Sequence, residues 1–273
     1  MNLMAKAASL IGGAKAMCSR AAEGTVHQPG SPSHTITWQV PEEVPVALQL
    51  NSEPYTVMMA TPADLRDFAI GFLLAEGLIK DTRAVQGVLV MPVENGITVD
   101  VALDEGAIDT TKRVNRSVEG RSGCGLCGVE DIADAIKTLR PLTGVSAPSV
   151  EAILKAAKAL PALQPMNQLN HTVHAAAWVS PEGDVVLVRE DVGRHNALDK
   201  LIGALAATDT DLGAGFVIVT SRCSYELVQK CAYAGIGALV SVSAPTALAL
   251  DLAREANLFL AALTRGGVVV FRS

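Results

Sequence analysis

Short apolar runs alternate with helix-like segments along the second half of this 273-residue chain. The runs VVLV, FVIV, LVSV and FLAAL are separated by stretches in which apolar residues recur at helical spacing. A chain with this alternation favours a layered fold, in which helices cover the faces of a sheet whose strands are mostly parallel. We therefore predict an α/β core domain with a mixed, mostly parallel sheet over residues 147–273.

The elements of this predicted core follow one another without long gaps. Helical spacing of apolar residues predicts helices at 149–160, 194–206, 225–234 and 247–257. Apolar runs predict two strands joined by a turn at 181–184, and further strands at 216–220, 238–242, 259–263 and 268–271.

The first half of the chain predicts a smaller α+β subdomain over residues 35–146. Apolar segments predict strands at 44–50 and 55–60, and a hairpin is expected around the tight turn Asn95–Gly96. The subdomain would end in a cysteine-containing loop and a helix over 129–139.

One helix of this subdomain has recognisable end residues. Thr61 is expected to be its N-cap, with Pro62 in the first turn and Asp64 closing a capping box. Gly77 is expected to end it.

Residues 1–34 are rich in alanine, glycine and serine. Lys15 interrupts their short apolar run, so the segment is not typical of a secretory signal peptide. We predict a mobile leader over 1–34 and, without a signal, a cytoplasmic protein. In that reducing compartment a CxxC pair is more typical of metal binding or of reactive chemistry than of a structural disulfide.

Charge and hydropathy exclude two classes of partner. The formal net charge of −6 opposes a broad nucleic-acid-binding surface, although it leaves room for a local basic pocket. No apolar run approaches the roughly 18 to 20 residues that a membrane span needs. The sequence thus predicts neither a nucleic-acid nor a membrane partner.

Polar or glycine-rich clusters follow four of the predicted strands, at 189–196, 220–222, 243–245 and 264–267. In open α/β sheets, ligands bind at the carboxyl ends of strands, where helix N-termini present N–H groups to anions. Arg194, Arg222 and Arg265 suit charge-assisted contacts with phosphate. The alternative, in which these clusters are only caps, turns and surface salt bridges, stays open.

The stretch RSGCGLCGVE, residues 121–130, holds Cys124 and Cys127 at CxxC spacing. Four interpretations arise: half of a zinc site, a thioredoxin-like redox pair, a pair of sulfur nucleophiles, and an inert glycine-rich turn. A thioredoxin-like motif normally lies near the start of a small fold. Here more than a hundred residues precede the pair and glycines surround it, which disfavours the redox interpretation.

A structural zinc site would need two further ligands. Cys18 lies in the predicted leader, and Cys223 and Cys231 do not stand at CxxC spacing. His171 and His174 are the best remaining pair, but they follow about 45 residues later. The H-x-E…P-C-x-x-C signature of zinc deaminases is also absent. We therefore predict no protein-held metal.

The nucleophile interpretation fits the neighbours of the pair. The surrounding glycines let the backbone bend freely and leave Cys124 unshielded. Cys127 directly precedes a predicted helix whose N-terminus lowers a thiol pKa, and Arg121 adds positive charge. An exposed, activated thiol on such a loop suits a group carrier that visits two partners.

Several longer motifs resemble one known family, the formate dehydrogenase accessory sulfurtransferases of the FdhD type. The resemblance is carried by GFLLAEGLI (71–79), RSGCGLCGVE (121–130), REDVGRHNALDKLIG (189–203), ELVQKCAYAGI with VSAPTALALDLA (226–253), and RGG (265–267). It covers nearly all of the chain from about residue 36 onward.

The resemblance implies a fold and a function. The fold would be a cytidine-deaminase-like three-layer core with an added N-terminal subdomain, usually in a homodimer. The activity would be that of a sulfurtransferase, which receives sulfur from a cysteine desulfurase and passes it to the molybdenum cofactor. That cofactor, a bis-(molybdopterin guanine dinucleotide), then goes to formate dehydrogenase. A non-catalytic chaperone for the cofactor, or a CxxC zinc protein, is the alternative.

The resemblance also implies site residues. Cys124 would carry the persulfide, with Cys127 as a neighbour that could release the sulfur. The family's cofactor-binding stretch falls on Leu263, Thr264, Arg265, Gly266, Gly267 and Val268. The predicted strand ends would add Arg194, His195, Ser221 and Arg222, and GDP-like nucleotides would fit the same place.

This chain departs from the family pattern in two places. The family often has Thr-Gly-Gly-x-His before the first core strand, whereas this chain has NHTVH at 170–174 and keeps only the last histidine. Many members have an aromatic residue before the Arg-Gly-x piece and an arginine after it, where this chain has Leu263 and Val268.

Overall fold

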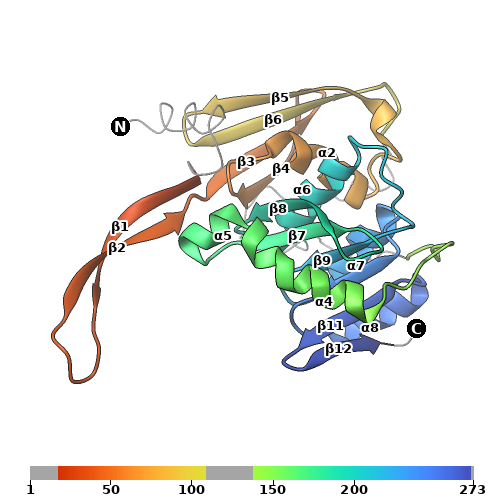
Figure 1. Ribbon diagram of the computed structural model, residues 1–273. Coiled ribbons are helices and arrows are strands. Elements are labelled where there is room, and N and C mark those ends of the chain that lie inside the picture. The colour runs from red at the N-terminus through yellow and green to blue at the C-terminus, as the bar shows by residue number, and fades with distance from the viewer. Residues whose placement is uncertain (1–17, 109–137, 272–273) are drawn as a thin grey trace.

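The structure, a computed structural model, describes residues 18–108 and 138–271 (Figure 1). Within these residues, a larger core sheet, a smaller N-terminal sheet and a ribbon of two strands are connected and covered by helices. The chain is therefore a mixed α/β protein, in agreement with the predicted class.

The core sheet of the described residues has the strand order β12-β11-β10-β9-β7-β8. Its strands are β7 (His174–Val179), β8 (Val185–Asp191), β9 (Phe216–Val219), β10 (Ala238–Ser241), β11 (Phe259–Thr264) and β12 (Gly267–Phe271). Only β9, β10 and β11 pair in parallel; β7 is antiparallel to β8 and β9, and β12 to β11. The sheet is mixed, but the expectation of mostly parallel pairing is wrong. The short turns between β7 and β8 and between β11 and β12 are hairpins, which force antiparallel neighbours.

The strand directions bring the predicted clusters together. Two antiparallel steps, from β8 to β7 and from β7 to β9, leave β8 running in the same direction as β9, β10 and β11. The carboxyl ends of these strands therefore meet at one edge of the core sheet. We call this edge, formed by residues 192–196, 220–222, 242–246 and 264–267, the strand-end edge.

Helices cover both faces of the core sheet (Figure 1). Helices α6 (Arg194–Leu205), α7 (Tyr225–Tyr233) and α8 (Ala247–Glu255) share one apolar core with the sheet. On the other face lies α4 (Val150–Ala159), which continues through η4 (Leu160–Leu163) into α5 (Pro165–Asn170). A cytidine-deaminase-like arrangement of these layers stays a prediction. Among the described helices, none combines the length and the apolar character that crossing a membrane would require.

The N-terminal sheet packs on a helix that it shares with the core. Its strands, in the order β4-β3-β6-β5, are β3 (Val44–Leu50), β4 (Glu53–Ala60), β5 (Val85–Val93) and β6 (Gly96–Leu103). One face of the sheet packs on α2 (Leu65–Ala75), which is followed by η2 (Thr82–Ala84). Helix α2 also contacts α6 so closely that a Cβ atom at Gly71 or Gly203 would clash with the backbone of the facing helix.

The predicted cap of α2 is wrong. Asp64, not Thr61, precedes the helix, and it does so in the left-handed region with φ 53° and no side-chain capping bond. Thr61 is fully buried instead: its N–H donates to Asp191 Oδ2 at 3.0 Å, and its hydroxyl accepts from the Val192 N–H at 3.0 Å. Thr61 thus bonds to Asp191 and Val192 of the core domain, although the local sequence predicts that it caps α2.

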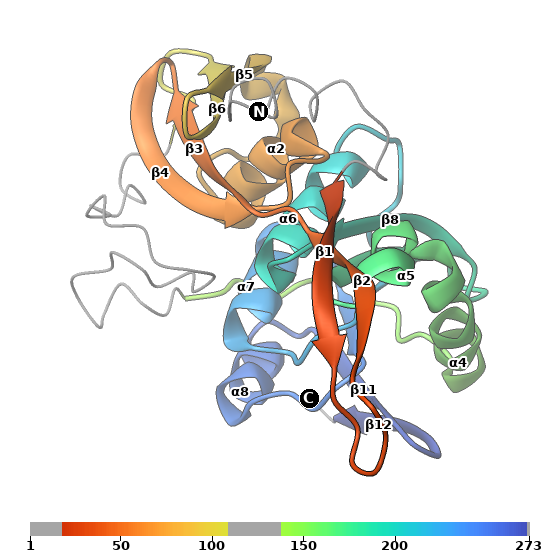
Figure 2. The ribbon, with the colours of Figure 1, turned by 90° about the vertical axis from the view of Figure 1, so that its left-hand side faces the viewer.

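The predicted leader over residues 1–34 is also wrong for its second half. Residues Ser19–Val26 form β1, which pairs antiparallel with β2 (His34–Pro41) and makes a ribbon that projects from the body (Figures 1 and 2). The backbone of β1 is hydrogen-bonded to β2, most of which lies beyond residue 34, the predicted end of the leader. The composition of residues 1–34 gives no sign of this pairing. Residues 1–17 lie outside the described part of the chain.

Candidate functional site

The strand-end edge holds eight of the ten residues for which cofactor binding is predicted, and the other two, Leu263 and Val268, directly flank it. Arg194 and His195 begin α6 after β8, and Ser221 and Arg222 follow β9. Leu263 and Thr264 end β11, and the turn at Arg265 and Gly266 leads into Gly267 and Val268 of β12. Four strand spacings separate β8 from β11, which corresponds to roughly 19 Å. The edge is therefore long enough for an extended ligand, while the binding itself stays a prediction.

Three arginines at this edge have no carboxylate partner among the described residues. Arg222 and Arg265 are exposed, and Arg194 is half-buried. Four arginines elsewhere have a carboxylate partner, namely Arg20, Arg83, Arg189 and Arg254; Arg189 Nη2, for example, lies 2.7 Å from Asp67 Oδ2. A guanidinium that is not neutralised by a neighbour is available to phosphate oxygens, which it binds through charge-assisted hydrogen bonds.

Two helices begin at this edge without a side-chain cap. The N-cap residue of α6 is Gly193, which has no side chain to accept a hydrogen bond, and Ser224 does not cap α7 with its hydroxyl. Helix α8 differs, because Thr246 accepts from the Ala249 N–H. The positive ends of the α6 and α7 dipoles thus add to the arginines and favour an anionic ligand.

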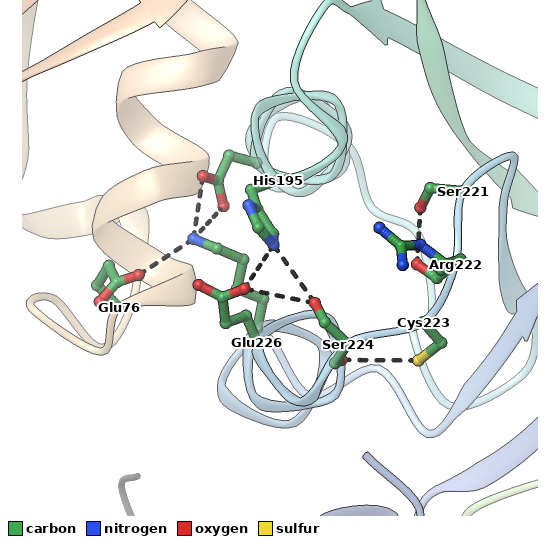
Figure 3. A network of polar contacts seen from close by, with 9 residues as sticks. Glu76, His195, Ser221, Arg222, Cys223, Ser224 and Glu226 are labelled. Carbon is green, nitrogen blue, oxygen red and sulfur yellow. Dashed lines mark hydrogen bonds and ion pairs between the residues drawn. The ribbon is translucent and has the colours of Figure 1, made fainter. Parts of the chain in front are cut away.

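His195 connects the starts of these two helices (Figure 3). Its Nε2 lies 2.8 Å from Glu226 Oε2 and 3.4 Å from Ser224 Oγ, and its side chain is only 9% exposed. The carboxylate of Glu226 therefore fixes the imidazole between α6 and α7. His195 does not cap α6, because Gly193 is the N-cap. A contact with a base stays a prediction.

Asp191, the last residue of β8, has a structural role. Its side chain is fully buried, with Oδ2 2.6 Å from Lys200 Nζ and Oδ1 accepting from the Gly193 N–H. The Asn196 amide also donates to Oδ1, at 3.0 Å. Asp191 thus shapes the loop between β8 and α6 from beneath, and contact with a ligand base is excluded by its burial.

Next to His195 lies a buried ion cluster that the sequence did not predict. Lys230 Nζ contacts Asp199 Oδ1 at 2.8 Å and Glu76 Oε1 at 3.1 Å (Figure 3). Glu226 and Lys230 stand four residues apart on α7, a spacing that usually marks an exposed salt bridge. Both are buried here, because α7 packs against α2 and α6. Only that packing shows which helix face the charges occupy.

Cys124 and Cys127 lie in the segment 109–137, outside the described residues. The three described cysteines, Cys18, Cys223 and Cys231, are all free and buried. Burial raises the pKa of the Cys223 thiol to about 12 and also raises those of Cys18 and Cys231. Because thiolates are the reactive form, these three side chains are poor sulfur acceptors.

The described chain resumes on the far side of the core from the strand-end edge. The Leu139 N–H donates to Glu255 Oε1, and the Leu142 N–H donates to the Ala256 carbonyl. Glu255 ends α8, which starts at the strand-end edge and runs back to the amino end of β11. The segment with Cys124 thus rejoins the described chain at the opposite end of the core sheet.

The altered turn at 170–174 ties the ribbon to the core. The Asn170 amide donates to Ser19 Oγ, and its Oδ1 accepts from the Thr172 N–H. His171 ends α5 with φ 53°, a left-handed conformation that suits the glycine of the family pattern better.

His174 begins β7 at the strand-end edge, where burial first and Arg194 second lower its pKa. Among the described residues, no three His, Cys, Asp or Glu side chains group as metal ligands.

Comparison with known proteins agrees with this architecture. The model of the FdhD/NarQ family matches residues 41–271. The chain is similar to the "Sulfur carrier protein FdhD" of Bordetella petrii, with 45% identity over 227 residues, 83% of this chain and 82% of the relative. It is 46% identical to the protein of the same name from Cupriavidus necator over 232 residues, 85% of this chain and 81% of that one.

A solved structure has the same fold. It is described as a candidate formate dehydrogenase accessory protein from Desulfotalea psychrophila. The two structures superpose with a TM-score of 0.73 and 26% sequence identity, and the match covers 94% of this chain and 97% of the other.

Proposed function

Because the chain belongs to the FdhD/NarQ family, we propose that it carries sulfur from a cysteine desulfurase to the molybdenum cofactor of a formate dehydrogenase. The curated relatives are named sulfur carriers, and the similar solved structure is described as a formate dehydrogenase accessory protein. The cofactor, bis-(molybdopterin guanine dinucleotide), is the substrate of this reaction rather than a resident group.

The observation that best supports the proposed sulfur site is the burial of Cys18, Cys223 and Cys231. The chain has five cysteines, and burial of the three described ones leaves Cys124 and Cys127 as the candidate acceptors. Cys124 is the proposed persulfide carrier, since it matches the first cysteine of the family motif. Free thiols among the described cysteines agree with a reducing cytoplasm, where we place the transfer.

The proposed chemistry consists of two thiol exchanges. The Cys124 thiolate attacks the outer sulfur of the desulfurase persulfide, so a new S–S bond forms on Cys124 and the desulfurase thiolate leaves. The Cys127 thiolate then attacks Cys124 Sγ, forms a Cys124–Cys127 disulfide and expels sulfide, which takes both bonding electrons. A dithiol reductant must reopen the disulfide before the next cycle.

The proposed place for the nucleotide ends of the substrate is the strand-end edge. Arginines that have no carboxylate partner in the described ranges meet uncapped helix starts there, and both suit a pyrophosphate. Arg194, Arg222 and Arg265 would contact the phosphates, and the stretch from Leu263 to Val268 would hold the nucleotide. A cytidine-deaminase-like core is the fold that the family resemblance implies for this sheet. With the nucleotides held at this edge, the molybdenum end can extend away from it.

The sulfur step is tested by mass spectrometry. We expect a one-sulfur adduct on the Cys124 peptide after incubation with a desulfurase and cysteine, and its loss in Cys124→Ala. Cys127→Ala should keep the adduct but fail to complete turnover, whereas Cys223→Ser should behave as the wild type. Cofactor binding without any adduct would instead identify a non-catalytic chaperone, and stoichiometric zinc in the purified protein would identify a CxxC metal site.

The nucleotide site is tested by calorimetry with GDP. Loss of a hydrogen bond to a charged group costs about 1.5 to 3 kcal/mol, so we expect Arg265→Ala and Arg222→Ala to weaken GDP binding by roughly 10- to 100-fold. Arg254→Ala is the matched control, because Arg254 is an exposed arginine already paired with Asp251. Equal GDP affinity in all three variants would show that the nucleotide does not bind at this edge.

A further inference from the structure

Thr61, the residue that follows β4, is bonded to the chain segment that leads into Arg194. Its hydroxyl and both of its backbone polar groups have partners there. The N–H donates to Asp191 Oδ2 at 3.0 Å, and the hydroxyl accepts from the Val192 N–H at 3.0 Å. The Thr61 carbonyl accepts from Lys200 Nζ at 2.9 Å. A single buried residue beside the N-terminal sheet thus contacts the end of β8, the loop that follows it and helix α6.

A further bond to the same segment comes from Met59, near the end of β4. The Asn196 amide donates to the Met59 carbonyl at 2.8 Å and to Asp191 Oδ1 at 3.0 Å. Asp191 Oδ1 also accepts from the Gly193 N–H at 2.8 Å. The turn from β8 into α6 is therefore bonded on both sides of Arg194, at Gly193 and at Asn196.

Only one of these bonds depends on the Thr61 side chain. Val192 is the first residue of the strand-end edge, and its N–H has the Thr61 hydroxyl as its acceptor. Without that hydroxyl the N–H would face a fully buried side chain that offers no acceptor, which is unfavourable. The loop would then shift so that the N–H reaches water. The peptide that shifts lies two residues before Arg194.

A loop that is fixed before the ligand arrives binds more tightly than one that must be ordered, since less conformational entropy is lost on binding. The other two arginines of the edge, Arg222 and Arg265, follow β9 and β11. The bonds from the end of β4 therefore support the part of the edge that carries Arg194.

We propose that Thr61 is a positioning residue for nucleotide binding, whose hydroxyl fixes the loop 192–193 so that Arg194 faces the phosphates. This role rests on the proposed function, since it presupposes a nucleotide at the strand-end edge. Thr61 is fully buried, so it acts through Arg194 and does not touch the ligand. The site then depends on the end of β4 as well as on the core sheet.

The first test is a double-mutant cycle in which calorimetry measures GDP binding. Thr61→Val keeps the shape of the side chain and removes the hydroxyl. Displacing an arginine loses part of its contact, so we expect GDP binding to weaken by about three- to tenfold. Because the effect passes through Arg194, Thr61→Val should change the affinity by less than about twofold in an Arg194→Ala background. The full loss in that background would overturn the proposal.

Thr61→Ser is the rescue variant, because serine keeps the hydroxyl, and it should bind GDP within about twofold of the wild type. Thr98→Val is the matched control, since it removes the hydroxyl of another buried threonine, on β6, and should leave the affinity unchanged. Equal losses in Thr61→Ser and Thr61→Val would overturn the role of the hydroxyl. If the valine variant does not fold, Thr61→Ala replaces it in the cycle and should weaken binding in the same way.

A second measurement follows the loop without ligand. Burial and then Arg194 lower the pKa of His174, so a displaced arginine should let that pKa rise. Asp191, which raises the same pKa, keeps its bond to the Thr61 N–H in Thr61→Val. NMR titration should show the rise in Thr61→Val and not in Thr61→Ser or Thr98→Val. An unchanged His174 pKa in Thr61→Val would overturn the proposal.

Failure of this proposal differs from failure of the proposed nucleotide site. If Arg265→Ala weakens GDP binding and Thr61→Val does not, the nucleotide binds at the edge but Thr61 does not position its arginine. If neither variant changes the affinity, the nucleotide does not bind at this edge, and the positioning role is wrong as well.

Discussion

Lys230 Nζ lies 2.8 Å from Asp199 Oδ1, and both side chains are buried where α2, α6 and α7 meet. Glu76 completes the cluster at 3.1 Å, and the Phe72 ring centroid lies 5.4 Å from the ammonium group. Burial raises the pKa of Asp199 to about 6 in spite of the nearby lysine. Burial alone would lower the pKa of Lys230, but the two carboxylates outweigh it and raise that pKa. The cluster ties the N-terminal helix α2 to the core.

Removal of the cation should make stability depend strongly on pH. In Lys230→Met the buried carboxylates of Asp199 and Glu76 lose the ammonium group that lies between them, and breaking a buried pair in this way costs about 3 to 5 kcal/mol. The pKa of Asp199 should rise further, and an acid with a raised folded pKa contributes stability at low pH that is lost as pH increases through that value. Urea denaturation should therefore show a larger loss at pH 8 than at pH 5.

The matched control for this change is Lys155→Met, which removes an exposed lysine that lies 2.8 Å from Asp184. Surface pairs contribute about 0 to 1 kcal/mol, so its effect should stay within that range at both pH values. An equal loss at pH 5 and pH 8 in Lys230→Met would show that the carboxylates are not the cause.

The close contact of α2 and α6 should not accept a methyl group. In Gly71→Ala the new Cβ would overlap the Asp199 carbonyl, so we expect a loss of about 1 to 3 kcal/mol in the free energy of unfolding. Gly24→Ala, where a Cβ meets nothing within 4 Å, is the control and should change little. Similar melting temperatures for the two variants would contradict the observed helix contact.

A glycine at position 171 should stabilise the protein. His171 adopts φ 53°, and the left-handed conformation costs a residue with a side chain about 1 to 2 kcal/mol. His171→Gly should raise the free energy of unfolding by up to about 1 kcal/mol, since glycine also loses more entropy on folding. His171→Ala keeps the strain and should bring no gain. Chemical denaturation separates the two outcomes.

The pKa of His174 should report anion binding at the strand-end edge. Burial and then the positive charge of Arg194 hold it below the usual value. A bound GDP would place negative charge near Arg194 and raise the His174 pKa, which NMR titration of the imidazole proton can follow. Arg194→Ala should raise the pKa without ligand. If GDP binds and the His174 pKa is unchanged, the phosphates lie elsewhere.

The order of the core elements could be read from local pattern. The predicted strand at 44–50 coincides with β3, and the start predicted for the helix at 194–206 coincides with that of α6. Ser149, the first residue of the helix predicted at 149–160, is the N-cap of α4, because its hydroxyl accepts from the Ala152 N–H. Apolar spacing and capping chemistry act over a few residues, so a single sequence contains them.

Contacts between distant residues could not be read in this way. Thr61 bonds to a residue 130 positions away instead of capping α2, and residues 19–26 pair as a strand instead of forming a leader. Glu226 and Lys230 of α7 stand at a spacing typical of an exposed pair, yet both are buried. In each case the local sequence is compatible with more than one structure, and a contact with a distant part of the chain decides which one forms.

The sequence by itself determined the alternation of strands and helices, the family and the candidate thiols Cys124 and Cys127. Only the tertiary structure decided that four polar clusters share one edge, that Cys18, Cys223 and Cys231 are buried, and that residues 19–26 pair with 34–41 in a ribbon. The physical reason is range: periodicity and turn chemistry act between neighbours, whereas burial and strand direction depend on the packing of the whole chain.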